Sequence, residues 1–315
     1  MGEVTLSVII VSWNGCELLS RCLSSLESQF REMNMEILVI DNASADNSVQ
    51  MIADRFPHVK LIANAENRGF AAANNQAAAL CSGRYLLLLN PDTELLPGVL
   101  RHLVTFAERH PDIGVLGPRL LNQDGSIQRS CWRGYPGITT AWVDALYLWK
   151  MPWLPLARNS EYAPDELQDT LDVDHLLGAC MLINRSAWDD VGPLDERYFL
   201  FLEETDWCRR AKSRGWRVVH YPHAAIVHHG QHSMRQQPSR NLPYLYRSYC
   251  LFYRDSPNSN AIGLTALKLV IALAILIRFA LWTVRRAFAR GDGQRNQARS
   301  MIHGYRQVLF ELPSL

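Results

Sequence analysis

Residues 86–96 read LLLLNPDTELL, an apolar run that ends abruptly in a proline and two carboxylates. The leucines predict a buried strand, because a strand that is covered on both faces is apolar at every position. Asn90, Pro91 and Asp92 are common turn residues, and an ordinary Pro-Asp turn is one interpretation of them. A ligand site at the end of the strand is the other interpretation, and the surrounding segments decide between the two.

The segments before this stretch alternate between strand and helix patterns. Short apolar runs at residues 6–11, 36–41 and 59–64 predict three further strands. Apolar residues spaced as on one helix face predict helices between them, the third at residues 70–80. The expected buried faces are Leu19, Cys22, Leu23 and Leu26 in the first helix, and Val49, Ile52, Ala53 and Phe56 in the second. We expect Ser44 or Asp46 to cap the second helix. This alternation predicts an α/β fold with a parallel sheet.

Polar side chains follow each of the four predicted strands. They are Ser12 and Asn14 after the first, Asp41 and Asn42 after the second, Asn64 after the third, and Asn90 and Asp92 after the fourth. The carboxyl ends of parallel strands meet at one edge of a sheet, where ligands bind in such folds. The sequence therefore predicts a ligand cleft at this edge rather than an isolated turn.

Composition excludes several classes of protein. The chain has 315 residues with 48% hydrophobic and 20% charged residues, which indicates a folded protein with a sizeable core. The formal charge of +1 gives no electrostatic reason to expect a nucleic-acid partner. Seven scattered cysteines with no CxxC pair indicate reduced thiols in a cytoplasmic protein rather than a disulfide framework or a zinc cluster. The N-terminus lacks the basic stretch of a signal peptide and runs directly into a predicted strand.

The middle of the chain, residues 128–174, loses periodicity and is rich in Trp, Tyr and Pro. A long irregular segment is usually a lid or a binding loop, or is poorly ordered, and its aromatic residues can equally serve packing. Order returns with DVDHLLGACMLINRSAW, which predicts a strand leading into a helix.

Seven short motifs carry a resemblance to a known family. SVIIVSWN, VIDNASADNS, NRGFAAANN, LLLLNPDTE, GACMLINR, LDERYFLFLEETDWCRRAKSRGWRV and HAAIVHHG occur in the order seen in glycosyltransferase family 2. The chain most resembles the rhamnosyltransferase-like bacterial branch, over about residues 6–233. The resemblance implies a GT-A fold, in which a mostly parallel nucleotide-binding sheet is flanked by helices. It also implies a nucleotide-sugar donor, a divalent metal, Mn²⁺ or Mg²⁺, and inversion at the anomeric carbon.

The resemblance assigns metal and diphosphate contacts to the end of the fourth strand. Asp92 matches the last acid of the family's Asp-x-Asp motif and is expected to bind the metal or the diphosphate. Asn90 stands in place of the first acid and is expected to contact the ribose or a metal-bound water. His228 matches a histidine that often completes the metal site, although a histidine at a strand end is more often a surface residue.

Further donor contacts are expected at the other strand ends. By resemblance Asp41 accepts a hydrogen bond from N3–H of a pyrimidine base, while capping of the next turn is its structural alternative. Asn67, Arg68 and Gly69 match the segment that closes over the nucleotide, and Gly69 can also be needed for its backbone angles alone. Ser12 and Asn14 complete the expected donor-binding set.

The motif EETD, residues 203–206, is the second acidic group. Inverting transfer needs a general base to take the proton of the acceptor hydroxyl. By resemblance Glu204 occupies the position of the family's catalytic Asp, and Glu203 is the alternative. Asp206 is expected to hold an arginine or to orient the acceptor. The other interpretation is an acidic first helical turn favoured by the helix dipole.

The C-terminal third contains an apolar segment, residues 261–290. Its uninterrupted apolar run, residues 269–277, is shorter than the ~20 residues that a spanning helix needs. Helical geometry puts its basic residues within one broad arc: Lys268, Arg278, Arg285, Arg286 and Arg290. We expect a basic amphipathic helix on an anionic membrane surface, with a buried helix or a true span as alternatives.

These inferences give one overall prediction. Residues 1–240 form the GT-A domain, with a nucleotide-sugar-binding half at 1–127 and an acceptor-side half at 128–240. Residues 241–315 form a helical, membrane-associating region. The expected activity is inverting transfer of a sugar, favoured to be rhamnose from dTDP-rhamnose, to a saccharide or polyprenyl-linked glycan of cell-wall or surface polysaccharide. The enzyme is expected at the inner face of the cell membrane.

Three other functions compete with this prediction. A nucleotide-dependent dehydrogenase would carry GxGxxG after the first strand, where the chain reads VSWNGCELL. A phosphohydrolase with an aspartyl nucleophile would need an acid where Asn90 stands. A non-catalytic, membrane-associated protein that binds a sugar nucleotide stays open, because Glu204 and Asn90 depart from the family pattern.

Overall fold

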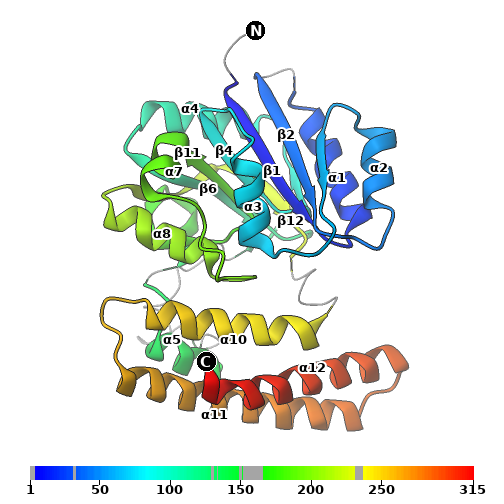
Figure 1. The fold of residues 1–315 in the computed structure, drawn as a ribbon, viewed down its shortest axis with the longest axis vertical. Helices are drawn as coiled ribbons and strands as arrows, with labels where there is room; N and C mark the ends of the chain where they lie inside the picture. Colours follow the sequence, from blue (N-terminus) through cyan, green and yellow to red (C-terminus); the bar gives the residue numbers. More distant parts are fainter. Residues whose placement is uncertain are drawn as a thin grey trace. The chain divides into compact units, whose positions relative to one another are not determined.

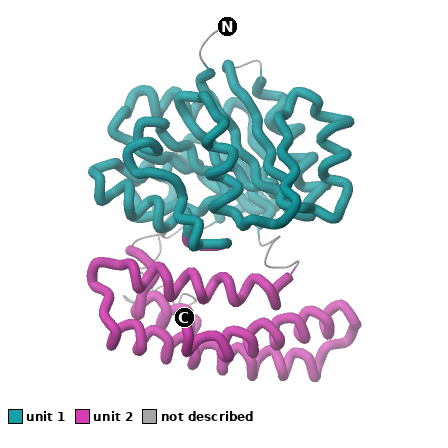
Figure 2. Tube along the Cα trace, viewed as in Figure 1, with its two compact units in different colours: residues 1–133, 162–199, 203–230 teal, residues 134–161, 200–202, 231–315 magenta. Residues whose placement is uncertain are grey.

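The computed structural model describes residues 4–30, 33–128, 131–132, 134–148, 151, 166–230 and 237–315. The chain forms two compact units (Figure 2). The first, here called the sheet unit, comprises Met1–Arg133, Tyr162–Phe199 and Glu203–Gly230. The second, the helical unit, comprises Gly134–Glu161, Leu200–Leu202 and Gln231–Leu315. Residues 134–161 thus group with the C-terminal helices, whereas the domain boundary at residue 240 stays a prediction.

The sheet unit is built on one mixed, mostly parallel sheet (Figure 1). Its strand order is β3-β2-β1-β4-β11-β6-β12-β5. The bounds are β1 Leu6–Ser12, β2 Met35–Asp41, β3 Lys60–Ala63, β4 Tyr85–Leu89, β5 Thr93–Leu95, β6 Ile113–Leu121, β11 Cys180–Asn184 and β12 Arg217–His228. The first four strands pair in parallel, as the sequence predicts. The strand β11 enters between β4 and β6 and is antiparallel to both.

Helices cover both faces of this sheet, which explains why the central strand β4 is buried along its whole length. They are α1 Cys16–Glu27, α2 Ser48–Arg55, α3 Phe70–Ala78, α4 Val99–Arg109, α7 Arg185–Val191 and α8 Glu203–Ser213. Alternate residues of β1 enter different cores: Val8 and Ile10 join the core that contains α1 and α4, and Ile9 joins the core that contains α3 and α8.

The predicted helix faces are confirmed for α1 and corrected for α2. All four predicted residues of α1 are buried. In α2, Ile52 and Phe56 are buried, but Val49 and Ala53 are exposed. The helix begins only at Ser48, and it buries the stripe that Ser48, Ile52 and Phe56 form. Its N-cap is Asn47, so neither Ser44 nor Asp46 caps it at that position. Asp46 instead accepts a hydrogen bond from the N–H of Ser48.

The segment predicted to be irregular contains regular structure. It contains the short strands β8 Cys131–Trp132 and β9 Leu171–Asp172 and the helix α5 Ile138–Ala145, and the short strands β7 Ile127–Gln128 and β10 His175–Leu176 lie at its two ends. Ile138, Ala141 and Ala145 of α5 pack into the core of the helical unit. A helix of eight residues is too short to be stable alone, so this packing stabilises it. Residues 152–165, which the lid interpretation included, lie outside the described residues.

In its described residues the helical unit contains α5, three longer helices and a short 3-10 helix at Leu312–Ser314. The longer helices are α10 Pro238–Arg254, α11 Ala261–Ala287 and α12 Asp292–Glu311. Their shared core includes Leu242, Tyr246, Ile271, Ile275 and Val308. Among the described residues, α11 is the one helix whose length and apolar composition would allow it to cross a membrane.

Candidate active site

Two buried polar atoms without a partner mark the carboxyl ends of β1 and β2. Ser12 and Asp41 face each other in the parallel register, and they are 0% and 1% exposed. One carboxylate oxygen of Asp41 accepts a hydrogen bond from the N–H of Ser44 at 2.9 Å, which is the turn-capping role. Its other oxygen and the Ser12 hydroxyl have no hydrogen-bond partner among the described residues. Buried polar groups are rarely left unpaired, so this pair is suited to a ligand that supplies the missing hydrogen bonds.

Asn14 joins the loops that follow β1 and β2. Its N–H donates to the Ser44 hydroxyl at 2.9 Å, and its side-chain oxygen accepts from the N–H of Ala45 at 2.7 Å. The residue has a φ of 52°, in the left-handed region that Asn tolerates better than most residues. Asn14 therefore fixes the shape of the loop beside Asp41.

The segment Asn67 to Gly69 is held by the ends of β2 and β3. The amide of Asn42 donates to the carbonyl of Gly69 at 3.0 Å, and Asn64 donates to Asn42 at 3.0 Å. The Asn67 side chain accepts from the N–H of Gly69 at 2.9 Å, while Arg68 is exposed and contacts Gln76. This network holds the start of α3 against the same sheet edge.

Gly69 is required by its surroundings as well as by its backbone. Its φ is +86°, and an added Cβ would lie 2.6 Å from the carbonyl oxygen of Phe199. The N–H of Phe70 donates to that same oxygen at 2.7 Å. The structure thus supports the interpretation of Gly69 as a backbone requirement.

Asp92 and His228 form a buried pair at the end of β4. Asp92 is 7% exposed, and its Oδ1 lies 3.4 Å from Nε2 of His228, which is also 7% exposed. Antiparallel pairing of β5 with β12 places His228 opposite Thr93, the residue after Asp92. His228 is therefore an interior residue of the site and not a surface histidine.

Gln128 sets the tautomer of His228. Its Oε1 lies 2.6 Å from Nδ1 of His228, and its amide nitrogen donates to Asn122 at 3.2 Å. An amide oxygen only accepts, so Nδ1 carries the proton and Nε2 is directed to Asp92. This is how histidines that bind metals are usually oriented. Gln128 was not predicted from the sequence, because its partner His228 lies 100 positions further along the chain.

These residues fit a divalent metal. Within the described ranges, no group of three or more His, Cys, Asp or Glu side chains could hold an ion alone. Two ligand atoms that each lie ~2.1 Å from a metal ion, on adjacent coordination positions, are about 3 Å apart. The 3.4 Å between Asp92 Oδ1 and His228 Nε2 is close to this separation. Two protein ligands leave coordination positions open, and diphosphate oxygens are suitable ligands for these.

The turn before β11 connects the end of β4 with α8. The N–H of Asn90 donates to the carbonyl of Ala179 at 2.9 Å. The neighbouring Gly178 lies against Glu204, whose Cγ would be 3.4 Å from a Cβ added at this glycine. Glu204 is thus at the same edge of the sheet as Asn90 and Asp92. Gly178 was not singled out in the sequence, although its motif GACMLINR was.

Glu203 and Glu204 are buried at the start of α8, 4% and 9% exposed. Carboxylates that serve only the helix dipole can remain in water, so burial argues against that interpretation. Each has one carboxyl oxygen without a hydrogen-bond partner among the described residues. The two residues before the helix, Phe201 and Leu202, have φ values of 71° and 67°, a strained entry of a kind that clusters at functional sites.

Burial raises the pKa of both carboxyl groups. The pKa of Glu203 rises well above its usual 4.5 because of desolvation and then the nearby charge of Glu204. The pKa of Glu204 is also raised by desolvation, but hydrogen bonds, including one from Glu203, partly offset this. Desolvation and the neighbouring carboxylate thus favour the protonated form of Glu203, whereas the hydrogen bonds to Glu204 favour its ionised form.

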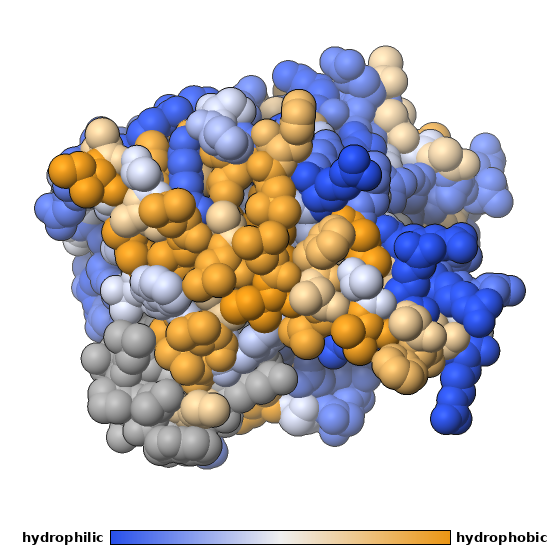
Figure 3. All heavy atoms as spheres, turned by 90° about the horizontal axis from the view of Figure 1, so that it is seen from below, coloured by the Kyte–Doolittle hydropathy of each residue, from blue (hydrophilic) through white to orange (hydrophobic). Residues whose placement is uncertain are grey.

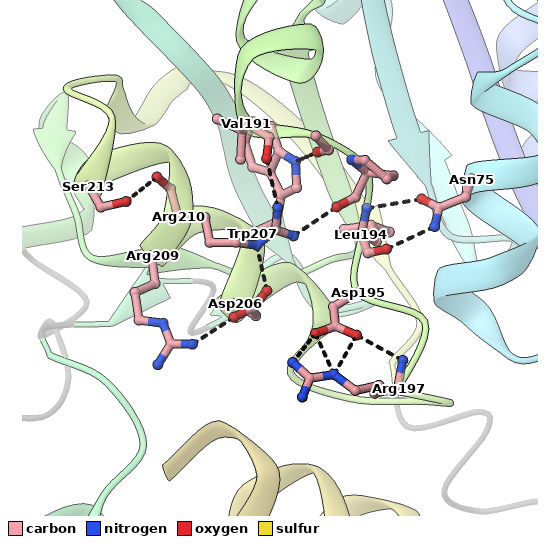
Figure 4. Close-up of polar contacts among 12 residues, drawn as sticks. Asn75, Val191, Leu194, Asp195, Arg197, Asp206, Trp207, Arg209, Arg210 and Ser213 are labelled. Carbon is pink, nitrogen blue, oxygen red and sulfur yellow. Dashed lines mark hydrogen bonds and ion pairs between the residues drawn. The ribbon is translucent and has the colours of Figure 1, made fainter. Parts of the chain in front are cut away.

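Asp206 is occupied by arginines of its own helix (Figure 4). It pairs with Arg209 at 2.8 Å and with Arg210 at 2.7 Å. Arg210 also donates to the carbonyls of Val191 and Pro193. Of the two roles expected for Asp206, the contacts support holding an arginine, which fastens α8 to the end of α7.

His175 is a further buried residue of this region that the sequence did not point to. Its Nδ1 lies 3.3 Å from the hydroxyl of Thr205, next to Glu204. Burial lowers the pKa of His175 to about 4, so the ring is neutral at pH 7.

Comparison with known proteins identifies the family. The model for glycosyl transferase family 2 matches residues 7–192. An N-acetylglucosaminyl-diphospho-decaprenol L-rhamnosyltransferase of Mycobacterium tuberculosis is 31% identical over 264 residues, 79% of this chain and 84% of that protein. The O-antigen biosynthesis protein RfbC of Myxococcus xanthus is 27% identical over 240 residues, 74% of this chain and 18% of that protein.

Solved structures agree on the fold. A mannosyltransferase of Pyrobaculum calidifontis, in complex with GDP-Man and Mn²⁺, aligns with a TM-score of 0.56 at 15% identity, over 99% of this chain and 88% of that one. Residues 1–349 of S. aureus TarS align with a TM-score of 0.51 at 13% identity, over 99% and 92%. The predicted GT-A fold is confirmed, and the dehydrogenase, phosphohydrolase and scaffold alternatives are set aside. The chain belongs to glycosyltransferase family 2 and is a rhamnosyltransferase-like glycosyltransferase.

Proposed function

We propose that the protein transfers rhamnose from dTDP-rhamnose, with inversion, to a saccharide carried on a polyprenyl diphosphate. The observation that carries this proposal is the match to the mycobacterial rhamnosyltransferase, which extends over most of both chains. The site supports it with the three kinds of group that such a transfer requires. These are contacts for a nucleotide, a buried acid–histidine pair and a buried carboxylate pair.

In this proposal the nucleotide binds at the ends of β1 and β2. The unpaired oxygen of Asp41 accepts the N3–H of the thymine base, and the Ser12 hydroxyl lies beside it. Asn14, Asn67, Arg68 and Gly69 form the surrounding donor loops, with Arg68 exposed and able to reach a phosphate. A ligand that satisfies buried polar atoms gains affinity, because those atoms are costly to leave unpaired.

The diphosphate is placed at Asp92 and His228, with Asn90 at the ribose or at a metal-bound water. These residues would hold Mn²⁺ or Mg²⁺, which supplies positive charge against the negative charge that develops on the departing diphosphate. Gln128 keeps the proton on Nδ1 of His228, so that Nε2 is directed to Asp92.

Glu204 acts as the general base. The acceptor hydroxyl oxygen forms a bond to the anomeric carbon on the face opposite the diphosphate, the bond to the diphosphate oxygen breaks, and the hydroxyl proton passes to Glu204. A carboxylate with a raised pKa is a stronger base than one in water. Glu203 donates a hydrogen bond that keeps Glu204 ionised, and Asp206 fastens the helix that presents both.

The proposed acceptor places the enzyme at a membrane. The apolar helix α11 supports a peripheral position at the cytoplasmic face of the cell membrane, where the carrier of the acceptor would be within reach. The product belongs to cell-wall or surface polysaccharide in this proposal.

Thermal shift with a panel of sugar nucleotides tests the donor. Ligands that bind the native state raise the melting temperature. We expect dTDP-rhamnose with Mn²⁺ to give a larger shift than UDP- or GDP-linked sugars, and the shift to fall when the metal is chelated. An equal response to all nucleotides would reject the assignment of the donor.

A further inference from the structure

The helix α11 carries a long exposed apolar face. Seven large side chains on or just after it are between 39% and 84% exposed. They are Ile262, Leu269, Leu273, Leu276, Leu281, Val284 and Phe288. Figure 3 shows a broad hydrophobic area on this side, bordered by hydrophilic surface. Soluble monomers rarely leave so much contiguous apolar surface in water, so this face is a docking surface.

The exposed apolar residues share one side of the helix. At ~100° per residue, Ile262, Leu269, Leu273, Leu276 and Val284 lie within a narrow stripe. Small residues continue it at Ala266, Ala280 and Ala287. From 262 to 287 the stripe is about 38 Å long at 1.5 Å per residue, and it contains no charged residue.

The basic residues lie on the other side, which corrects the expectation of a basic membrane face. Arg278 is 8% exposed and pairs with Asp144 of α5 at 2.8 Å. Lys268 donates to the carbonyl of Pro313 at 3.2 Å. The apolar side of α11 therefore faces outward, whereas Lys268 and Arg278 face the other residues of the helical unit. They do so because each of them has a hydrogen-bond acceptor there.

The same contacts argue against a membrane-spanning α11. Arg278 also donates to the carbonyl of Asp144 at 2.9 Å, and its guanidinium lies over the ring of Tyr147. On its inner side, α11 packs on α5 and α12 through Leu267, Ile271, Ile275 and other core residues. Surrounding α11 with lipid would separate these helices and leave Arg278 in the bilayer core, which is costly.

Exposed cations gather around the C-terminal end of the apolar stripe. Residues 285–299 contain five arginines, at 285, 286, 290, 295 and 299, and one acid, Asp292. All five arginines are exposed. Arg285 stacks against Trp282, and the exposed Phe288 caps the end of α11. Apolar burial beside cations that can reach headgroups is the arrangement of a helix that lies in the membrane interface.

We propose that the exposed stripe of α11 inserts into one leaflet of an anionic bilayer, parallel to its plane, with the arginine cluster at the headgroups. The biological role of this surface rests on the proposed lipid-linked acceptor. The surface itself is inferred from the geometry of the helical unit. In this arrangement both ends of α11 lie on the same side of the membrane, unlike the ends of a spanning helix. Binding depends on anionic lipid, unlike association between two copies of the chain.

Vesicle co-sedimentation of the full chain tests the surface. We expect binding to preformed vesicles that contain phosphatidylglycerol, and weaker binding to phosphatidylcholine alone. Leu269→Glu or Leu276→Glu should each reduce partitioning at least about tenfold, because a carboxylate at the acyl level is costly. The matched control is Leu80→Glu, which changes an equally exposed leucine of the sheet unit and should bind as wild type does. Joint substitution Arg285→Gln and Arg286→Gln should weaken the preference for anionic lipid and its sensitivity to salt.

Three outcomes would decide against the proposal. Wild-type binding by Leu269→Glu would overturn the assigned face. If that variant instead turned a dimer into a monomer with no change in lipid binding, the face would be a contact between copies. The sidedness of the chain can be measured with protease-sensitive tags at its two ends in sealed inverted vesicles. We expect protease to cut both tags from the same side of the membrane. Tags accessible from opposite sides would establish that α11 spans it. Hydrolysis of the donor in solution should be the same in every variant as in the wild type. If the wild type binds vesicles but does not bind dTDP-rhamnose, only the proposed donor is rejected and the membrane surface stands.

Discussion

At the scale of single residues, the account depends on a pair that the sequence places 136 positions apart, Asp92 and His228. Their separation of 3.4 Å and their burial make them the expected metal ligands. Asp92→Asn and His228→Gln should each weaken Mn²⁺-dependent binding of the donor about tenfold or more. Titration calorimetry with and without metal measures this effect.

A neighbouring histidine provides the control for this prediction. The side chain of His229 contacts Glu94 at 2.7 Å and Gln123, and only its backbone N–H reaches Asp92, at the carbonyl oxygen. His229→Gln should therefore leave metal-dependent binding near the wild-type level. Gln128→Leu should weaken metal-dependent binding about tenfold or more, because partners of a metal-binding histidine typically contribute about 10- to 100-fold in affinity. Equal affinity in Asp92→Asn and wild type would make Asp92 an ordinary turn residue.

The two glutamates of α8 should respond differently to the same change. Glu204→Gln should lower kcat about 10²-fold or more with near-normal binding of the donor, because it removes the base. Glu203→Gln should keep most of the activity, since an amide can donate the same hydrogen bond as a protonated carboxyl group. Steady-state kinetics of both variants decide the matter, and the reverse pattern would assign the base to Glu203.

The raised pKa of Glu203 also makes a prediction about stability. In the unfolded chain this carboxyl group titrates near 4.5, whereas in the folded protein its pKa is higher. The folded protein thus holds a proton that the unfolded chain has lost, and its stability falls as pH rises from about 4.5 through the folded pKa. Glu203→Gln removes this dependence. Its melting temperature should match the wild type near pH 4 and exceed it at pH 8, and a constant difference across that range would contradict the assignment.

Much of this site was predictable residue by residue, because strand ends and short motifs are local signals. Ser12, Asp41, Asn90 and Asp92 follow apolar runs directly, and parallel strands bring such ends together. Gln128, Gly178 and His175 were not predictable. Each acts through a contact with a residue distant in the sequence, and nothing local distinguishes them from other polar or small residues.

At the scale of elements, the approach of Gly69 to Phe199 connects the start of α3 with the loop before α8. Gly69→Ala should destabilise the protein through both its positive φ and the overlap with the Phe199 carbonyl, and it should weaken binding of the donor. Gly98 has a φ of +78° but nothing within 4 Å of an added Cβ. Gly98→Ala therefore isolates the backbone cost, about 1 kcal/mol. Thermal denaturation of both variants measures the difference, and equal losses would show that the contact with Phe199 contributes nothing.

Periodicity predicted the long, strongly patterned elements better than the short ones. In α1, four apolar residues at helical spacing determine the buried face. In α2, which is only eight residues long, the N-terminal boundary lies later than the capping residues suggested, and the buried stripe rotates toward Ser48. The helix α5 was not predicted, because its burial depends on α11, more than a hundred residues further along the chain.

At the scale of the whole molecule, the helical unit combines two distant parts of the chain. Residues 134–161 join the C-terminal helices, so removal of the chain after Asn258 would leave α5 without α11. Loss of membrane binding in such a truncated chain could reflect unfolding alone. Single substitutions on the exposed face of α11 avoid this difficulty, which is why the vesicle experiment uses them.

The most direct test of the account is a transfer assay with labelled dTDP-rhamnose, Mn²⁺ and a synthetic N-acetylglucosaminyl-diphospho-polyprenol. We predict that the wild-type full chain moves labelled rhamnose into the lipid fraction with inverted anomeric configuration. Glu204→Gln should lose at least about 10²-fold of this rate while still binding the donor. A product with retained configuration, equal transfer by Glu204→Gln, or transfer only from another sugar nucleotide would contradict the account.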